Sequence, residues 1–469
     1  MEKDRIKGIV IAGTGSGCGK TTVTCGILKA LQATGKETAA FKCGPDYIDP
    51  MFHSEIIGTG SGNLDAFLCG ENSMKYLYAK NSGKAEISVI EGVMGFYDGL
   101  GREGRYSTYS TARLTGAPVV LVVNPKGMAL SVAAVIKGFR DFIPDNSIKG
   151  VILNPLAPSL YQMYRSIIEE KTGLRVYGFL PELKEAAIGS RHLGLITSAE
   201  IEDMQQKLEL LACNTRKYVD LEGLVELAEE AEEICYEPVE IDEKHHGLRI
   251  AVARDRAFCF YYRDSLELLE RLGAELVYFS PLSDCCIPEA VDGLVLGGGY
   301  PELYGSELSN NTSMLSSIKA AVEELMPVYA ECGGFMYLQE TITDMRKNTF
   351  TMVGALKGNS SMQDRLPRFG YITLKAKEDN LLCRKGECIN AHEFHYSDSD
   401  KNGGSFSALK PDGKREWDCI FADETMAAGY PHMHFYGNTG FAESFLQKCS
   451  KFKTKKSNRN AFTEINTQE

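Results

Sequence analysis

The sequence predicts an α/β protein with two doubly wound domains, for three reasons. Its 469 residues exceed what a single hydrophobic core usually serves. Short apolar runs alternate with stretches of helical spacing in two separate series, the pattern of parallel βα units. Each series contains a glycine-rich turn directly after an apolar run. We expect residues 1–240 to form the first domain, residues 247–449 the second, and residues 450–469 a polar, disordered tail.

The composition is that of a soluble globular protein, with 43% hydrophobic and 24% charged residues. A net charge of −12 argues against nucleic acid as a partner. No apolar run approaches the roughly 20 residues that span a bilayer, so we expect no membrane contact. The 14 cysteines form neither a disulfide framework nor a zinc-binding spacing, which indicates a reducing, cytoplasmic location.

The first glycine-rich turn runs from Gly13 to Thr21, between the apolar run Gly8–Ala12 and the helical stretch Thr22–Leu31. Strand, glycine loop, Lys-Thr and helix in this order predict a phosphate site, whereas a turn without a ligand is the weaker alternative. The loop is one residue longer than the common P-loop and is similar to that of dethiobiotin synthetase. The expected ATP-binding residues are Gly13, Gly15, Gly17, Gly19, Lys20 and Thr21.

Further apolar runs predict the other strands of this domain, and ligands of such sheets bind at the carboxyl ends of the strands. Helical spacing between them is clearest at Ser131–Phe142 and Leu160–Lys171. The predicted strands are Thr38–Phe41, Ile87–Ile90, Val119–Val123, Val151–Leu153 and Val176–Leu180.

Acidic residues follow two of these strands. Asp46 and Asp49 come after the second strand, and Glu91 comes directly after the third. Carboxylates at this edge, beside a phosphate loop, suit Mg²⁺ or the handling of a proton, although a solvated turn would look the same. We expect Thr21, Asp46 and Glu91 to hold Mg²⁺, directly or through water.

Three arginines, Arg102, Arg105 and Arg113, follow the third strand and could bind substrate carboxylates, unless they are ordinary surface residues. Beyond them, a Glu-rich stretch from about Asp220 to Glu243 predicts a solvated helix and a linker that continues through His246.

The second series begins at Leu248–Ala253 and contains a strand, sharp turn and helix over Pro327–Met336, with Cys332 at the turn. Small neighbours and a helix start are typical of a nucleophile elbow, here with a thiol. The alternative is that Cys332 is a buried, unreactive thiol. Backbone N–H groups of an oxyanion hole would come from Gly298, Gly299 and Gly333.

A nucleophilic thiol needs a base, and the sequence offers two sources. One is His432 or His434, which would face the same side of a strand. The other is the block His392–Tyr396. The spacing of its two histidines around Glu393 does not match a zinc motif, so a metal site there is disfavoured.

The two sites in this order resemble those of the cobyrinate a,c-diamide synthase family. Many glutaminases carry an acid two residues after the base, but here, as in this family, that position is a histidine, His434, so a Cys-His dyad is expected. The residues that carry the resemblance extend from residue 8 to about residue 445. They are the phosphate loop, Lys42–His53, Glu91–Gly99, Ser190–Leu195, Ala257–Tyr262, Gly297–Glu302, Tyr329–Met336, His392–Ser397 and Tyr430–Phe435.

The resemblance implies a reaction. Cys332, activated by His432, would attack the amide of glutamine, and the ammonia would pass to the first domain. There ATP with Mg²⁺ would phosphorylate the a- and c-acetate carboxylates of cobyrinate, and ammonia would displace the phosphate. Asp98 would orient substrate or ammonia, and Asp49, Arg102 and Arg105 are further candidates for handling the substrate. A homodimer is compatible with this picture.

Rival interpretations remain at this point. The same chemistry on Ni-sirohydrochlorin, in coenzyme F430 biosynthesis, would use the same motifs. A P-loop ATPase switch without synthase activity would explain residues 8–180 only, and it gives no use to Cys332 and His432. A glutamine sensor would need a damaged phosphate loop, yet Lys20, Thr21 and Glu91 are all present.

Overall fold

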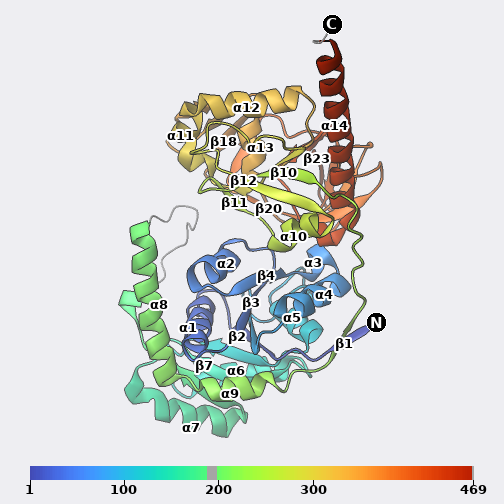
Figure 1. Ribbon diagram of the computed structural model, residues 1–469. Helices are drawn as coiled ribbons and strands as arrows, with labels where there is room; N and C mark the ends of the chain where they lie inside the picture. Colours follow the sequence, from blue (N-terminus) through green and yellow to red (C-terminus); the bar gives the residue numbers. More distant parts are fainter. Residues whose placement is uncertain (187–197, 467–469) are drawn as a thin grey trace. The chain divides into compact units, whose positions relative to one another are not determined.

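The computed structural model describes residues 1–186 and 198–466 (Figure 1). The chain divides into two compact units, Met1–Val239 and Glu240–Glu469. The expected domains were residues 1–240 and 247–449. The boundary between the two units lies at the end of the Glu-rich stretch. The segment that joins the last strand of the first unit to the first strand of the second contains no helix or strand.

A parallel sheet forms the core of the first unit (Figure 1). Its seven strands follow the order β4-β3-β5-β2-β6-β7-β8, and each neighbouring pair is parallel. The inner strands are continuous apolar runs because helices cover both faces of the sheet. The strands are β2 (Gly8–Gly13), β3 (Thr38–Cys43), β4 (Gly60–Leu64), β5 (Ile87–Glu91), β6 (Val119–Val123), β7 (Ile148–Leu153) and β8 (Arg175–Phe179).

Alternate side chains of these strands pack into two separate hydrophobic cores, one on each face of the sheet. Ile9 and Ile11 of β2 pack with helices α1 (Lys20–Ala33), α8 (Ser198–Tyr218) and α9 (Leu221–Ala228) on one face. Val10 and Ala12 pack into the core of the other face. The helices that contribute to that second core are α4 (Glu71–Ser82), α5 (Thr108–Thr115), α6 (Ser131–Phe142) and α7 (Tyr161–Thr172).

Short elements complete the first unit. Helix α2 (Ile48–Met51) continues into the π-helix η1 (Phe52–Ile57), which buries Phe52, Ile56 and Ile57. Strand β1 (Glu2–Asp4) pairs with β9 (Ile234–Tyr236). The remaining short helices are α3 (Ala66–Cys69), η2 (Pro158–Leu160) and η3 (Lys184–Ala186).

Two features of this unit differ from the prediction. Strand β4 reads Gly-Ser-Gly-Asn-Leu and was not predicted, because it is an edge strand that pairs only with β3 and has almost no apolar side chains. The helix predicted in the Glu-rich stretch ends at Ala228, before most of its acidic residues, and it is not fully solvated: Leu224 and Leu227 are buried in the core.

The second unit is built on a mixed sheet of order β12-β10-β13-β15-β25-β24, in which only β24 runs antiparallel to its neighbour. The strands of this sheet are β10 (Leu248–Ala253), β12 (Ala274–Phe279), β13 (Gly293–Leu296), β15 (Val328–Glu331), β24 (Phe421–Ala422) and β25 (Met426–Gly429). The helices of this unit are α10 (Arg263–Arg271), η5 (Pro301–Tyr304), α11 (Gly305–Asn310), α12 (Thr312–Glu323), α13 (Gly333–Leu338), η6 (Phe435–Gly437) and α14 (Thr439–Asn466).

Three smaller sheets carry the remaining strands. An antiparallel sheet of order β23-β22-β19-β20-β26 brings β20 beside the short strand that contains His432. Another has the order β17-β16-β18-β21, and β11 pairs with β14. The bounds are β11 (Phe258–Phe260), β14 (Gly298–Gly299), β16 (Thr341–Thr343), β17 (Thr349–Thr351), β18 (Asn359–Met362), β19 (Arg368–Ala376), β20 (Cys388–His395), β21 (Ser397–Ser399), β22 (Phe406–Leu409), β23 (Glu416–Cys419) and β26 (His432–Met433).

The tail that we expected to be disordered is helical as far as the structure describes it, because α14 continues to Asn466. The helix is anchored in the core by the buried side chains of Phe441, Phe445 and Leu446. No glycine or proline follows Gly440, so nothing in the polar sequence interrupts the helix once it has begun.

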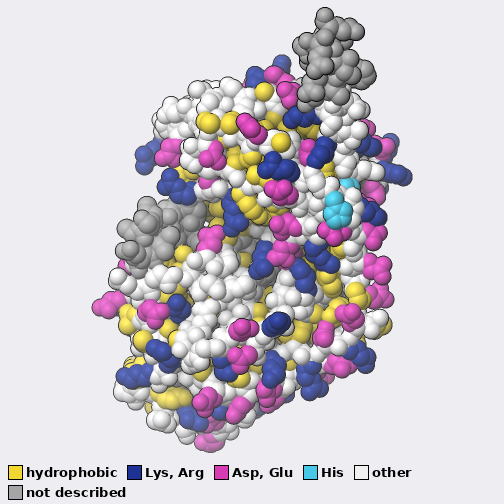
Figure 2. Space-filling model, viewed as in Figure 1, with side chains coloured by type: hydrophobic (Ala, Val, Ile, Leu, Met, Phe, Trp, Pro, Cys, Tyr) yellow, Lys and Arg dark blue, Asp and Glu magenta, His cyan; other side chains and the backbone are white. Residues whose placement is uncertain are grey.

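Lys, Arg, Asp and Glu side chains are interspersed over the face seen in Figure 2. Within residues 1–186 and 198–466, no helix is both long and apolar enough to cross a lipid bilayer. All fourteen cysteines are free thiols.

Candidate active sites

The phosphate loop lies between the end of β2 and the start of α1, and its glycines serve two different purposes. Gly17 and Gly19 adopt left-handed φ angles of 78° and 88°. A Cβ added to Gly13 would lie 2.4 Å from the sulfur of Cys18, so this glycine is needed for packing. Gly15 and Gly17 have open space where a Cβ would point. The loop therefore exposes its backbone at these two residues, as phosphate binding requires.

Lys20, the first residue of α1, is buried and folds back over the loop. Its Nζ donates to the carbonyl oxygens of Gly15, at 3.1 Å, and Met94, at 2.5 Å. Burial lowers the pKa of Lys20. In this position the ammonium group lies across the loop whose backbone would cradle the phosphates.

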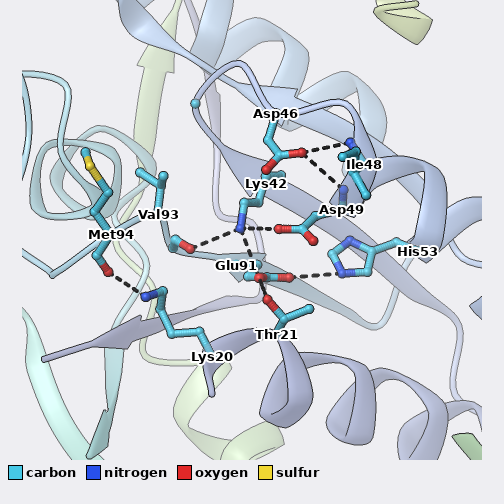
Figure 3. A network of polar contacts seen from close by, with 12 residues as sticks. Lys20, Thr21, Lys42, Asp46, Ile48, Asp49, His53, Glu91, Val93 and Met94 are labelled. Carbon is cyan, nitrogen blue, oxygen red and sulfur yellow. Dashed lines mark hydrogen bonds and ion pairs between the residues drawn. The ribbon is translucent and has the colours of Figure 1, made fainter. Parts of the chain in front are cut away.

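A buried polar network lies directly beside this loop (Figure 3). The parallel register of β3 and β5 places Lys42 opposite Glu91, and Lys42 Nζ lies 2.9 Å from Glu91 Oε1 and 2.6 Å from Asp49 Oδ2. Thr21 Oγ1 donates to Glu91 Oε1 at 2.5 Å. His53 Nε2, from the π-helix, lies 3.1 Å from Glu91 Oε2.

The network keeps Glu91 ionised although its side chain is fully buried. Burial by itself raises the pKa of Glu91, but the charge of Lys42 and the contacts of His53 and Thr21 outweigh it and lower the pKa to about 2. A carboxylate with this pKa is negative at neutral pH. It is therefore suited to binding a cation beside the phosphates.

The structure brings only some of the expected residues of this site together. Thr21, Glu91 and Asp49 meet in the network, but Asp46 Oδ1 accepts from the backbone N–H groups of Ile48 and Asp49 at 2.7 and 3.3 Å. The Asp46 carboxylate therefore caps the first N–H groups of α2.

Asp98 and the two arginines lie on an exposed loop after β5. Asp98 Oδ2 accepts from Gly95 N at 3.0 Å, and Gly95 packs against Gly15, which places Asp98 close to the phosphate loop. Arg102 and Arg105 are exposed. Arg105 lies 3.9 Å from Glu103, a weak surface pair that gives no sign of a binding role.

The donor set fits Mg²⁺. Within the described residues, no cluster of three or more His, Cys, Asp or Glu side chains is arranged to hold a metal ion. Mg²⁺ in nucleotide sites, however, usually takes one or two protein oxygens and completes its shell with phosphate oxygens and water. The adjacent Thr21 hydroxyl and Glu91 carboxylate supply such a pair.

Lys42, His53 and Asn63 are residues of this site to which sequence reasoning gave no role. Asn63 Nδ2, on β4, donates to the carbonyl oxygens of Gly44 and Asp46 at 2.9 and 2.7 Å and so holds the loop after β3. The sequence could have singled out Lys42, because it is a charged residue near the end of an otherwise largely apolar strand. His53 and Asn63 carried no such signal.

In the second unit, Cys332 occupies a sharp turn between β15 and α13. Its φ is 46°, a strained value for a residue with a side chain. Cys332 N donates to Gly429 O at 2.7 Å, and its own carbonyl accepts from Met336 N at 3.0 Å, so the turn is fixed on both sides. This is the predicted strand, turn and helix of a nucleophile elbow.

His432, on β26, is hydrogen-bonded to Cys332. Its other nitrogen, Nδ1, lies 3.3 Å from Glu331 Oε2. Burial by itself lowers the pKa of His432, but the charge and hydrogen bond of Cys332 and those of Glu331 raise it to about 10. The imidazole is thus suited to take up the thiol proton and to remain charged beside the thiolate.

The three glycines expected at the oxyanion hole lie together beside this pair. A Cβ on Gly333 would lie 3.0 Å from Gly299 N, and a Cβ on Gly298 would lie 2.6 Å from His432 Cε1. The backbone of β14 therefore passes directly beside the elbow and the imidazole. Only residues without a side chain allow this approach.

The other histidines have different environments. His434 Nδ1 accepts from Tyr436 N at 3.3 Å, and its ring packs on Tyr262. His395 Nδ1 lies 2.6 Å from Ser397 O, and its ring stacks on Tyr430. His392 lies opposite His432 in the β20–β26 register, and burial lowers its pKa to about 3. Of the candidate bases, His432 is the one recorded in hydrogen-bonding contact with Cys332.

Sequence reasoning gave no role to Glu331. It directly precedes Cys332, and its signal was an acidic residue at the end of a buried strand, as for Glu91. Its partner His432 lies 101 residues further along the chain.

A P-loop nucleotide site in one unit and a Cys–His glutaminase site in the other define an ATP-dependent glutamine amidotransferase. Residues 9–195 match the CobQ/CobB/MinD/ParA nucleotide binding domain, and residues 249–440 match the CobB/CobQ-like glutamine amidotransferase domain. One stretch behind the resemblance, Ser190–Leu195, lies outside the described residues.

Curated relatives named cobyrinate a,c-diamide synthase align over nearly the whole chain. The protein of Clostridium tetani is 43% identical over 94% of this chain and 100% of its own. That of Caldanaerobacter subterraneus is 41% identical, over 94% and 98%, and that of Listeria innocua is 42% identical, over 92% and 96%. The chain belongs to the cobyrinate a,c-diamide synthase family.

Proposed function

We propose that this protein amidates the a- and c-acetate carboxylates of cobyrinate, with glutamine as the nitrogen donor and ATP as the energy source. The observation that carries the proposal is the presence on one chain of a phosphate loop beside an ionised buried carboxylate and of a Cys–His elbow. The relatives reported above carry the name of this activity, which favours cobyrinate over Ni-sirohydrochlorin.

The first half of the reaction takes place at Cys332. His432 takes the thiol proton, and the thiolate attacks the amide carbon of glutamine. Backbone N–H groups of Gly298, Gly299 and Gly333 stabilise the resulting oxyanion, and each such donor contributes about 2.7–4 kcal/mol to the barrier reduction. His432 then donates its proton to the leaving ammonia. Water hydrolyses the thioester and releases glutamate.

The second half takes place at the phosphate loop. A carboxylate is a poor electrophile, so a substrate oxygen first attacks the γ-phosphorus of ATP, which yields an acyl phosphate and ADP. Ammonia then attacks the acyl carbon, and phosphate leaves with the carboxylate oxygen. Lys20 and the backbone at Gly15 and Gly17 hold the phosphates, and Lys42 places a positive charge beside Glu91.

Mg²⁺, held by Thr21 and Glu91, would offset the negative charge of the transferring phosphoryl group. We keep Asp46 as a ligand through water only, because its carboxylate already caps α2. Asp49 and Asp98 are the retained candidates for substrate handling. Arg102 and Arg105 stay the weakest candidates, since both are exposed.

Several further features belong to the same proposal. We place the protein in the cytoplasm, a location supported by its fourteen free thiols. We propose that it contacts neither nucleic acid nor a membrane. A homodimer is the assembly to test, by light scattering on the purified full-length chain.

The test of the proposal follows the mass of the tetrapyrrole. The protein is incubated with Mg-ATP, glutamine and either cobyrinic acid or Ni-sirohydrochlorin. Each amidation replaces a hydroxyl with an amino group, and we expect the change to stop at the diamide of cobyrinic acid. A faster reaction with Ni-sirohydrochlorin would change the substrate assignment. Hydrolysis of ATP and glutamine with neither substrate altered would refute the proposed substrate class.

Two variants serve as controls. Cys332→Ser should abolish amidation from glutamine but retain amidation from ammonium chloride, because only the thiol chemistry is removed. Lys20→Met should abolish amidation from either nitrogen source. If both variants lose the ammonium-dependent reaction, the separation into two half-reactions is wrong.

A further inference from the structure

The carboxylate of Glu331 is held rigidly beside the catalytic histidine. Glu331 is the last residue of β15, in the middle of the mixed sheet, and is 7% exposed. Its Cα partner on β25 is Gly429, which has no side chain to compete for the space. Oε1 accepts from Met433 N at 2.8 Å and from the hydroxyl of Tyr329. Oε2 is thereby directed at His432 Nδ1, 3.3 Å away.

This contact determines which nitrogen of the His432 imidazole carries the proton. A carboxylate only accepts hydrogen bonds, so the nitrogen that faces it carries the proton. When Nδ1 holds the proton, Nε2 has a free lone pair for the thiol of Cys332. Once His432 has taken up that proton, the negative charge of Glu331 stabilises the imidazolium. The same logic underlies the acid in Ser-His-Asp sites, which orients the base without being protonated itself.

The position where many related glutaminases carry this acid is occupied here by His434. That side chain accepts a hydrogen bond from Tyr436 N and packs on the ring of Tyr262. The His434 side chain is therefore engaged by Tyr436 and Tyr262. Glu331 is the carboxylate within hydrogen-bond range of His432 in the described structure.

We propose that Glu331 is the positioning residue of the glutaminase site, so that Glu331, His432 and Cys332 act as a triad whose acid directly precedes the nucleophile. The proposal rests on the proposed function and extends it. It replaces the Cys-His dyad expected from the sequence. The groups that surround His432 are Cys332 on the elbow, Glu331 on β15 and His392 on β20. The charge of His432 also lowers the pKa of Glu393 and of His395, both on β20.

Glu331→Gln is the sharpest test because it retains the shape of the side chain. The amide oxygen can still accept from Met433 N, but the amide NH₂ would face Nδ1 of His432 and favour the tautomer with the proton on Nε2. That tautomer cannot accept the thiol proton. We expect glutamine-dependent kcat to fall by about 10²–10⁴-fold, with KM for glutamine nearly unchanged. Ammonium-dependent amidation should be retained.

Two further variants separate orientation from packing. Glu275→Gln removes the charge of an exposed acid on β12 of the same sheet, so it should retain the glutaminase activity. Glu331→Asp retains the charge on a shorter side chain and should recover part of the activity lost in Glu331→Gln. If Glu275→Gln is as inactive as Glu331→Gln, or if Glu331→Asp recovers nothing, the role of Glu331 is structural.

A second readout does not depend on the tetrapyrrole. Alkylation of Cys332 by iodoacetamide is followed over pH by mass spectrometry of the peptide that contains it. In the wild type the imidazolium stabilises the thiolate, so reactivity should extend to lower pH than in Glu331→Gln. An unchanged alkylation profile in a folded variant would overturn the proposal. Failure of the wild type to amidate cobyrinate would leave this comparison intact, so the two failures are distinguishable.

Discussion

Lys42 Nζ lies 2.9 Å from Glu91 Oε1 and 2.6 Å from Asp49 Oδ2, and all three side chains are almost completely buried. One ammonium group thus forms ion pairs with two carboxylates at the edge of the sheet where ATP is expected to bind. The arrangement keeps Glu91 negative without exposing it to water.

Removal of this cation should destabilise the first unit. In Lys42→Met the carboxylates of Asp49 and Glu91 lose their common partner, and breaking a buried ion pair in this way costs about 3–5 kcal/mol of unfolding free energy. Urea denaturation followed by circular dichroism would measure it. The matched control is Lys7→Met, because Lys7 forms a solvent-exposed pair with Glu229 at 2.8 Å, whose removal should have a much smaller effect on stability. Equal losses in the two variants would contradict the assigned role.

The phosphate-loop glycines should respond differently to alanine. A Cβ at Gly13 would meet the sulfur of Cys18 at 2.4 Å, so Gly13→Ala should lower stability by about 1–3 kcal/mol. A Cβ at Gly15 meets nothing within 4 Å, so Gly15→Ala should fold normally and instead weaken ATP binding by about tenfold, a loss of roughly 1.4 kcal/mol. Thermal unfolding and ATP titration calorimetry measure the two effects. Normal ATP affinity in Gly15→Ala would show that the phosphates do not lie over this residue.

Gly298→Ala should disable the glutaminase half-reaction. The new Cβ would lie 2.6 Å from His432 Cε1 and would push the imidazole away from Cys332, so we expect the rate of glutamate release to fall by at least about 10²-fold. Ammonium-dependent amidation should persist. Gly404→Ala, in the same unit and with open space around its Cβ, is the matched control and should retain activity. Comparable glutamate release by both variants would refute the close approach.

Glu393 should make the second unit less stable as pH rises. Burial raises the pKa of Glu393 from 4.5 to about 7, so between these pH values the folded protein retains a proton that the unfolded chain has lost. Stability therefore falls as pH increases through this range. We expect Glu393→Gln to gain stability relative to the wild type between pH 5 and pH 8, by on the order of 2–3 kcal/mol. Urea midpoints for both proteins at several pH values measure the difference. A difference that does not change with pH would rule out titration of Glu393 in this range.

The metal dependence should separate the two sites. Removal of Mg²⁺ with EDTA should stop ATP-dependent amidation, because Thr21 and Glu91 are proposed to hold the ion beside the phosphates. Alkylation of Cys332 should be unaffected, since no metal is invoked at that site. Full amidation in the presence of excess EDTA would exclude Mg²⁺ as the cofactor.

Much of the architecture follows from local sequence. Apolar runs such as Gly8–Ala12 and Val119–Val123 predicted strands of the first unit, because a strand covered on both faces needs apolar side chains throughout. The edge strand β4 could not be predicted in this way. It contributes to the fold through backbone pairing with β3 and the amide of Asn63 rather than through apolar packing.

The sequence by itself determined the two reactive loops, the P-loop around Lys20 and the elbow around Cys332. Both are continuous segments whose glycines and position between strand and helix dictate their conformation. Tertiary structure alone decided the further contacts of Lys42 and Glu331 with these loops. Lys42 reaches Glu91 through the order and register of the strands, and Glu331 reaches His432 across 101 residues of chain. Such pairings depend on how strands are arranged in a sheet, which the residues near either partner do not encode.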